Sequence, residues 1–132
     1  MSLPGNSHSH CLMCGEENPL SLRLRFEPDE NGAVHTVFKG HEGLQGYRGI
    51  LHGGVISSLL DAAMTNCLFH LGVEALTGDL QVRFLKPVPC TVAVDIRAWV
   101  ETSLPPLYQL RAELVCGETV MARAEGKFAR FN

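Results

Sequence analysis

Long hydrophobic runs and clustered basic residues are both missing from this 132-residue sequence. No apolar stretch approaches the roughly 20 residues that a membrane-spanning helix needs, so we expect no membrane insertion. Lys and Arg number 11 against 14 Asp plus Glu, and the basic residues are scattered, which argues against nucleic-acid binding. The N-terminus also lacks the hydrophobic segment of a signal peptide, and we therefore expect a cytoplasmic protein.

Disulfide patterning is absent too. The five cysteines are odd in number and irregularly spaced, which is typical of a reducing compartment. A content of 45% hydrophobic and 19% charged residues is that of a globular protein, and the length fits one domain. We expect residues 1–10 to be a flexible leader and residues 11–132 to form the domain.

Two kinds of hydrophobic periodicity divide the chain. Leu20–Phe26 alternates as a half-buried strand does, and Ala33–Phe38 predicts a second short strand. From Gly54 to about Leu71 the period becomes helical, with apolar residues around most of the circumference, so this helix must be buried. Four further strands are expected after it: Leu80–Leu85, Thr91–Glu101, Tyr108–Cys116 and Thr119–Phe131.

This order predicts an α+β fold in which an antiparallel sheet wraps around one long central helix. A generic α+β sandwich with a surface helix is the alternative. It would leave the second apolar face of the helix uncovered, so we favour the wrapped helix.

A polar stripe runs along the predicted helix, because Gly54, Ser58, Asp61 and Thr65 fall within a narrow arc at 100° per residue. Asp61 stands out among apolar neighbours, where an unpaired carboxylate is costly. It could accept hydrogen bonds from Ser57, Ser58 or Thr65, or pair with a strand arginine. It could instead be a carboxylate at the floor of a cleft, with a raised pKa, that acts as general base or nucleophile.

Two glycines open the same helix. The N–H groups of Gly53 and Gly54 are unsatisfied donors of the first turn and could bind an oxyanion, although the pair could also merely allow a sharp turn. Gly53 and Asp61 are eight residues apart, about 12 Å along one helix. Both cannot then lie roughly 3 Å from one reacting carbonyl. If both take part, they come from different subunits of a homodimer.

One stretch reads Gly49-Ile50-Leu51-His52-Gly53-Gly54 and is followed after six residues by Asp61. A later stretch reads Thr77-Gly78-Asp79-Leu80-Gln81-Val82-Arg83-Phe84-Leu85-Lys86-Pro87. This combination of motifs is specific when the two stretches are taken together. It resembles the hotdog-fold thioesterase superfamily, in particular the branch with the phenylacetate-pathway thioesterases, from Cys11 onward. The resemblance implies a hotdog fold, acyl-CoA thioester hydrolysis, no cofactor, and a homodimer with shared active sites that could pair further into a tetramer.

The resemblance also implies roles for four residues. Gly53 would polarise the thioester carbonyl through its backbone amide, and Asp61 of the other subunit would be the base or nucleophile. Thr77 would orient water near that carboxylate, although it could simply cap a strand. His52 would position the loop or the substrate carbonyl, or be an ordinary structural histidine.

We expect the acyl group and the CoA portion of the substrate to contact two different sets of residues. The acyl group would lie along the helix near Gly54, Ser58, Met64 and Thr65. The phosphates of CoA would meet cations such as Arg48, Arg83 or Lys86. The related branch often has Asn where this chain has Gly46, and Gln45 could substitute for it.

Three other interpretations fit the sequence less well. A hotdog hydratase or dehydratase would need a different His and acid arrangement, and a non-catalytic acyl-CoA binder usually accompanies a DNA-binding segment. Cys11 and Cys14, with His8 and His10 nearby, could in principle bind zinc. Zinc sites normally bring a second ligand pair from a separate element, and none follows here, so we expect no metal.

Overall fold

The computed structural model describes residues 8–131; residues 1–7 and 132, which include most of the expected leader, lie outside the described residues. The elements in chain order are β1 (Glu27–Pro28), β2 (Val34–Lys39), the short 3-10 helix η1 (Glu42–Leu44), α1 (Gly53–His70), β3 (Ala75–Phe84), β4 (Ala93–Leu104), β5 (Leu107–Cys116) and β6 (Thr119–Arg130). The strands form one six-stranded sheet in the order β1-β2-β4-β5-β6-β3, with every neighbouring pair antiparallel.

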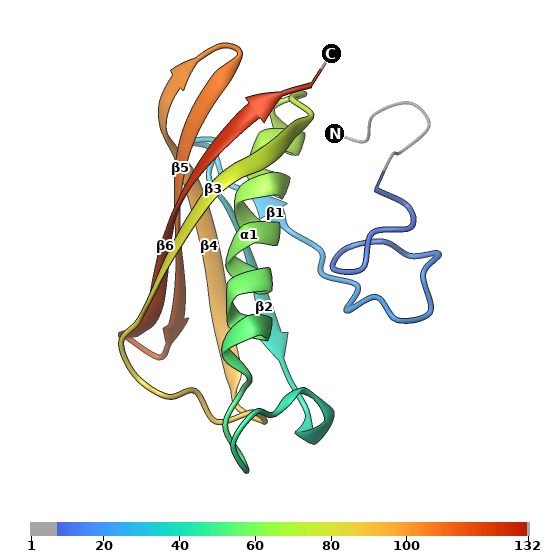
Figure 1. Ribbon diagram of the computed structural model, residues 1–132, viewed down its shortest axis with the longest axis vertical. Helices are drawn as coiled ribbons and strands as arrows, with labels where there is room; N and C mark the ends of the chain where they lie inside the picture. The colour runs from blue at the N-terminus through green and yellow to red at the C-terminus, as the bar shows by residue number, and fades with distance from the viewer. Residues whose placement is uncertain (1–7, 132) are drawn as a thin grey trace.

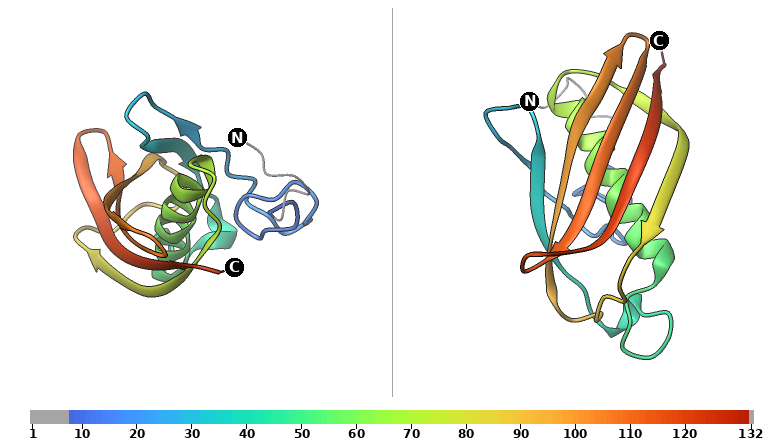
Figure 2. Two further views of the ribbon diagram at one scale, coloured as in Figure 1. Left: turned by 90° about the horizontal axis from the view of Figure 1, so that it is seen from above. Right: turned by 90° about the vertical axis from the view of Figure 1, so that its left-hand side faces the viewer.

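The sheet curves around one side of α1, as the two directions of view show (Figures 1 and 2). Leu59, Leu60 and Met64 of α1 have no exposed surface, and they belong to the same core as Ile96 and Ala98 of β4, which are also fully buried. The hydrophobic effect therefore holds a nearly all-apolar helix against the concave face of the sheet. The wrapped helix predicted from the periodicity is confirmed.

The first predicted strand is wrong. Leu20–Phe26 does not join the sheet, and only the two residues of β1 pair with β2. The Leu22 amide donates instead to the Leu12 carbonyl and the Leu24 amide to the Met13 carbonyl, each at 2.9 Å. The alternation in this segment reflects burial of alternate side chains against the core rather than pairing within the sheet.

The remaining boundaries follow the predictions closely, with one exception. The helix agrees to within one residue at each end, and the hairpin turns fall at Pro105-Pro106 and at Gly117. Strand β3 begins at Ala75, five residues before the predicted start at Leu80, because Thr77-Gly78-Asp79 forms a bulge inside the strand rather than a turn before it.

The N-terminal segment lies on the side of α1 away from the sheet (Figures 1 and 2). Its Leu24 and Phe26 are buried in the core, and Met13 and Cys14 pack against it. Between this segment and the edge strand β3, the polar stripe of α1 stays partly accessible. Within residues 8–131 no helix is long and apolar enough to cross a membrane.

Candidate active site

His52 begins the site because it is the N-cap of α1. Its Nδ1 accepts a hydrogen bond from the Gly54 amide at 2.8 Å. A neutral His52 ring must therefore carry its proton on Nε2, which leaves an outward N–H donor. A side chain at position 54 would place its Cβ 3.0 Å from Nδ1, so glycine there lets the cap close.

The loop before the helix is fixed by its own hydrogen bonds. The Gln45 Oε1 accepts from the Gly49 amide at 2.9 Å, and the Gly46 amide donates to the Ile50 carbonyl at 2.9 Å. Gly49 has a φ of 79°, which a residue with a side chain rarely adopts. Gln45 thus braces the turn with its side-chain oxygen. At Gly46 an added Cβ would lie 3.4 Å from the His52 backbone.

Only one of the two candidate oxyanion donors remains available. The Gly54 amide is taken by His52 Nδ1, and the Val55 and Ile56 amides donate to the His52 carbonyl. Among the described residues, the Gly53 amide has no hydrogen-bond acceptor. An N–H at the positive end of a helix is suited to a developing negative charge. The capping geometry therefore leaves the Gly53 amide as the free donor of the two.

Asp61 is half-buried on the polar stripe, and its partner is Thr77. The Thr77 hydroxyl donates to Asp61 Oδ1 at 2.7 Å, which joins α1 to β3. Burial raises the pKa of the Asp61 carboxyl above its usual value, and the Thr77 hydrogen bond partly offsets this. The Ser58 hydroxyl donates to the Gly54 carbonyl at 2.8 Å instead of to Asp61.

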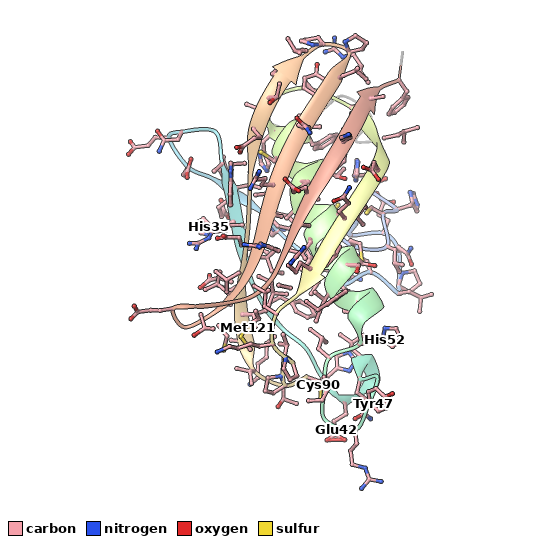
Figure 3. The ribbon with its side chains drawn as sticks, turned by 60° about the vertical axis from the view of Figure 1, so that its left-hand side comes forward. His35, Glu42, Tyr47, His52, Cys90 and Met121 are labelled. Carbon is pink, nitrogen blue, oxygen red and sulfur yellow. The ribbon has the colours of Figure 1, made fainter. Side chains whose placement is uncertain are left out.

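An open groove of about 630 Å³ lies beside the start of α1. Gly53 and His52 line it together with Lys86 and with apolar side chains that the sequence interpretation did not single out, including Tyr47 and Phe84. Figure 3 shows Tyr47 and His52 at the same end of the molecule. Tyr47 is 89% exposed and Phe84 53% exposed. Exposed apolar surface of this kind is typical of a site that binds a partner or a ligand. An aromatic residue in a glycine-rich loop was the available signal for Tyr47.

The other predicted contact residues separate into two groups. Gly54, Ser58 and Thr65 lie on the accessible stripe. Met64 does not, because it is fully buried in the core, where its methyl group would lie 3.0 Å from a Cβ at position 126.

The three predicted cations do not gather at one place. Lys86 lines the groove, and Arg48 is exposed in the turn that carries Tyr47. Arg83 instead lines a different hollow on the sheet, formed with Arg111 and Arg123 of β5 and β6. Arg83 is therefore separate from the groove.

The wrapped helix and its stripe define a hotdog fold, and the comparisons agree. Residues 48–103 match the Thioesterase superfamily model. The chain is 28% identical over 114 residues to acyl-coenzyme A thioesterase THEM4 of Bos taurus, a match that covers 81% of this chain and 45% of that protein. The chain thus spans about half the length of that relative.

Two solved structures have the same fold. The thioesterase superfamily protein RHA08564 superimposes with a TM-score of 0.83 at 23% identity, covering 89% of this chain and 61% of that one. The Escherichia coli PaaI protein from the phenylacetic acid degradation operon gives a TM-score of 0.77 at 19% identity, covering 84% and 81%. The predicted resemblance to the hotdog-fold thioesterase superfamily is confirmed.

Proposed function

We propose that this protein hydrolyses acyl-CoA thioesters as a homodimer with shared active sites. The proposal rests on two groups of one helix. The Gly53 amide has no hydrogen-bond acceptor among the described residues, and the Asp61 carboxylate is half-buried. The two groups lie about 12 Å apart along α1, so one chain cannot bring both to one carbonyl. The similarity to the thioesterase superfamily and to an acyl-coenzyme A thioesterase supports the reaction class.

A two-fold axis near Ser57 would complete the site. Ser57 is midway between Gly53 and Asp61, so antiparallel helices related by that axis exchange these two positions. Strand β3 runs along the same path, since Gly53 lies beside Phe84 and Asp61 bonds Thr77 near its other end. The same axis therefore falls near the middle of β3.

The edge of the sheet supports this assembly. Within residues 8–131 strand β3 pairs only with β6, and seven of its ten residues are exposed, with Leu76 at 61%. A long unpaired edge strand with exposed apolar side chains invites pairing with another chain. Pairing of β3 with the partner's β3 would extend the sheet across the axis.

In the proposed reaction the Gly53 amide of one subunit holds the thioester oxygen. The partner's Asp61, aligned by Thr77, takes a proton from water as the water oxygen attacks the carbonyl carbon. The negative charge on the oxygen is stabilised by the Gly53 amide at the positive end of α1. Collapse of the intermediate breaks the carbon–sulfur bond, and the proton held by Asp61 passes to the departing thiolate.

Asp61 could instead attack the carbonyl itself and form an anhydride that water then hydrolyses. A single turnover in ¹⁸O-labelled water tests for the anhydride route, since label in Asp61 can arise only from it. Attack by water puts the label only in the acid product. The anhydride route leaves the carboxylate with one oxygen exchanged when water attacks at the aspartyl carbon.

The substrate would cross the interface. We place the acyl group along Ser58 and Thr65 of the subunit that supplies Asp61, where the stripe is accessible. The CoA portion would lie toward the groove with Tyr47 and Lys86, and Arg48 at the neighbouring turn could reach a phosphate.

The five cysteines, all free, support a reducing, cytoplasmic location.

The test is release of free CoA thiol from short, medium, long and aromatic acyl-CoAs. Wild type should release thiol from at least one class, and Asp61→Asn should abolish release while remaining folded and dimeric. Asp95→Asn, an exposed acid on β4, is the matched control and should keep full activity. Normal hydrolysis by Asp61→Asn, or a fully active monomer, would overturn the proposal. Loss of enoyl-CoA absorbance without thiol release would favour a hydratase.

A further inference from the structure

We propose that His8, Cys11 and Cys14 form a binding site for a zinc ion. One ring nitrogen of the histidine and the two sulfur atoms lie within 4.8 Å of one another, and Cys14 Sγ is 3.4 Å from His8 Nδ1. Tetrahedral zinc bonded to nitrogen at about 2.1 Å and to sulfur at about 2.3 Å holds its ligands roughly 3.5–3.8 Å apart. Small rotations of the side chains would bring the three atoms to that spacing. The inference does not depend on the proposed thioesterase activity.

The sequence supplies no second pair of ligands, but the turn supplies a third ligand. The Cys11 amide donates to the His8 carbonyl at 3.0 Å, and the Gly15 amide donates to the Cys11 carbonyl at 2.9 Å. These consecutive turns bring residues three apart onto one side of the loop. A regular His-x-x-Cys-x-x-Cys spacing therefore becomes a cluster of donors.

Gly15 is what allows the loop to close this tightly. A Cβ at that position would lie 2.4 Å from the Cys11 nitrogen, 2.5 Å from the Ser9 oxygen and 2.7 Å from the Cys11 oxygen. All three contacts are with backbone atoms, which cannot move aside as a flexible side chain would. Glycine at this position is thus required by the same geometry that gathers the three donors.

The backbone also orients one of the ligands. The Met13 amide donates to Cys11 Sγ at 3.3 Å. Hydrogen bonds of this kind hold metal ligands in a fixed orientation. The chemistry of the cluster, two sulfurs and one imidazole, is the donor set that zinc prefers among common divalent ions.

Packing holds the turn in place before any ion binds. Hydrogen bonds from Leu22 to Leu12 and from Leu24 to Met13 tie the turn to the segment that enters the core. The His8 ring lies 4.8 Å from the Phe69 ring near the end of α1. The donors are therefore held against the helix, at the end opposite Gly53.

A fourth position remains for water. A hollow of about 450 Å³ is lined by His8 and Cys14, together with Asn66 and His70 of α1. Two thiolates and one neutral imidazole would balance the charge of the ion, and binding would release the two thiol protons to solvent. The ion would clamp the N-terminal segment over the face of α1 that the sheet leaves uncovered.

The test uses the full-length, untagged protein purified under reducing conditions without chelator. Elemental analysis should find about one zinc ion per chain. Cys14→Ser and His8→Ala should lose most of it, whereas Cys116→Ser, at the far end of β5, should retain it. Co²⁺ added to the metal-free wild type should produce thiolate-to-cobalt absorption that is missing in Cys14→Ser and present in Cys116→Ser.

Stability gives a second readout, because the effect of a chelator on the wild type can be measured whether or not a variant folds. A strong chelator should lower the Tm of the wild type and of Cys116→Ser but leave that of Cys14→Ser unchanged. The proposal would be overturned if the wild type contained no zinc after dialysis against zinc. It would also be overturned if Cys14→Ser and the wild type contained the same amount of zinc. A Cys11–Cys14 disulfide in the reduced preparation would overturn it in favour of a redox pair.

Discussion

The Thr77 hydroxyl donates to Asp61 Oδ1 at 2.7 Å, so the edge strand β3 and the central helix are joined at the proposed catalytic carboxylate. This bond lowers the pKa of Asp61, against the larger effect of burial, which raises it. A base must be deprotonated to work, so the position of this balance determines the pH at which activity is lost.

Replacing Thr77 by Ala should move the acid limb of the pH–rate profile to higher pH. Without the hydroxyl, burial alone acts on Asp61 and its pKa rises further. Loss of one hydrogen bond to a charged group should also lower kcat/KM by about tenfold, or roughly 1.4 kcal/mol. Thr77→Ser keeps the hydroxyl and should restore both. A profile that does not move in Thr77→Ala would show that the bond does not tune the reacting group.

Stability should change in the opposite direction from activity when Asp61 becomes Asn. Because burial raises the pKa of Asp61 in the folded state, the folded protein binds the proton more tightly than the unfolded chain. The native state is therefore penalised progressively as pH rises above the ordinary value of 3.8. Asp61→Asn should raise Tm at pH 7 and lose this advantage near pH 3.5. Equal Tm values at pH 7 would contradict the assignment of desolvation as the main cause.

The helical part of the site was predictable from the sequence, because a period of 3.6 residues places Gly54, Ser58 and Asp61 on one stripe without knowledge of the rest. The selection of Gly53 over Gly54 was not, since it depends on the rotamer with which His52 caps the helix. Phe84 lines the groove through tertiary arrangement alone, and Tyr47 had no sequence signal beyond being an aromatic residue in a glycine-rich loop. Leu20–Phe26 was misassigned because alternation reports burial, and a strand also needs a neighbour with free hydrogen-bonding groups.

The N-terminal half of the chain also contains contacts that the sequence pattern alone does not predict. The sequence spacing of Cys11 and Cys14 was visible, but the approach of His8 depends on two successive backbone turns. Later in the chain the sequence predicts a strand only from Leu80, yet the strand continues through the bulge at Thr77-Gly78-Asp79 back to Ala75. Local composition indicates where the backbone bends but not what the bend brings together.

His52 should prove separable into a structural and a chemical role. Its Nδ1 caps α1, so His52→Ala should lower the free energy of unfolding by about 1 kcal/mol. His52→Asn supplies another good capping oxygen and should recover that stability. If Nε2–H also contacts the substrate carbonyl, His52→Asn will stay impaired in kcat/KM. Denaturant melts and kinetics on the same two variants distinguish the roles, and full activity in His52→Asn would leave only the cap.

The proposed oxyanion donor, the Gly53 amide, can be removed by a substitution that the first turn of the helix tolerates. Gly53 is the first residue of α1, a position where proline is tolerated, and His52 has φ −61° and ψ 135°, which suits a residue before proline. Gly53→Pro deletes the N–H and should lower kcat by about 10²–10³-fold with the fold intact. Gly53→Ala keeps the N–H, and its Cβ would meet the Phe84 ring at an ordinary 3.6 Å. It should therefore stay within about threefold of wild type. Equal activity in the two variants would exclude the Gly53 amide.

These two inactive variants together test whether the site is shared. In a mixed dimer of Asp61→Asn and Gly53→Pro chains, the first chain contributes an intact Gly53 and the second an intact Asp61. One of the two sites is then complete and the other lacks both groups. Random pairing makes about half of the dimers mixed, so activity should return to about a quarter of wild type. If each chain held a whole site, every mixture would remain inactive. Co-expression with two different affinity tags, followed by tandem purification of the mixed dimer, should raise the recovered activity to about half, because every molecule then carries one complete site.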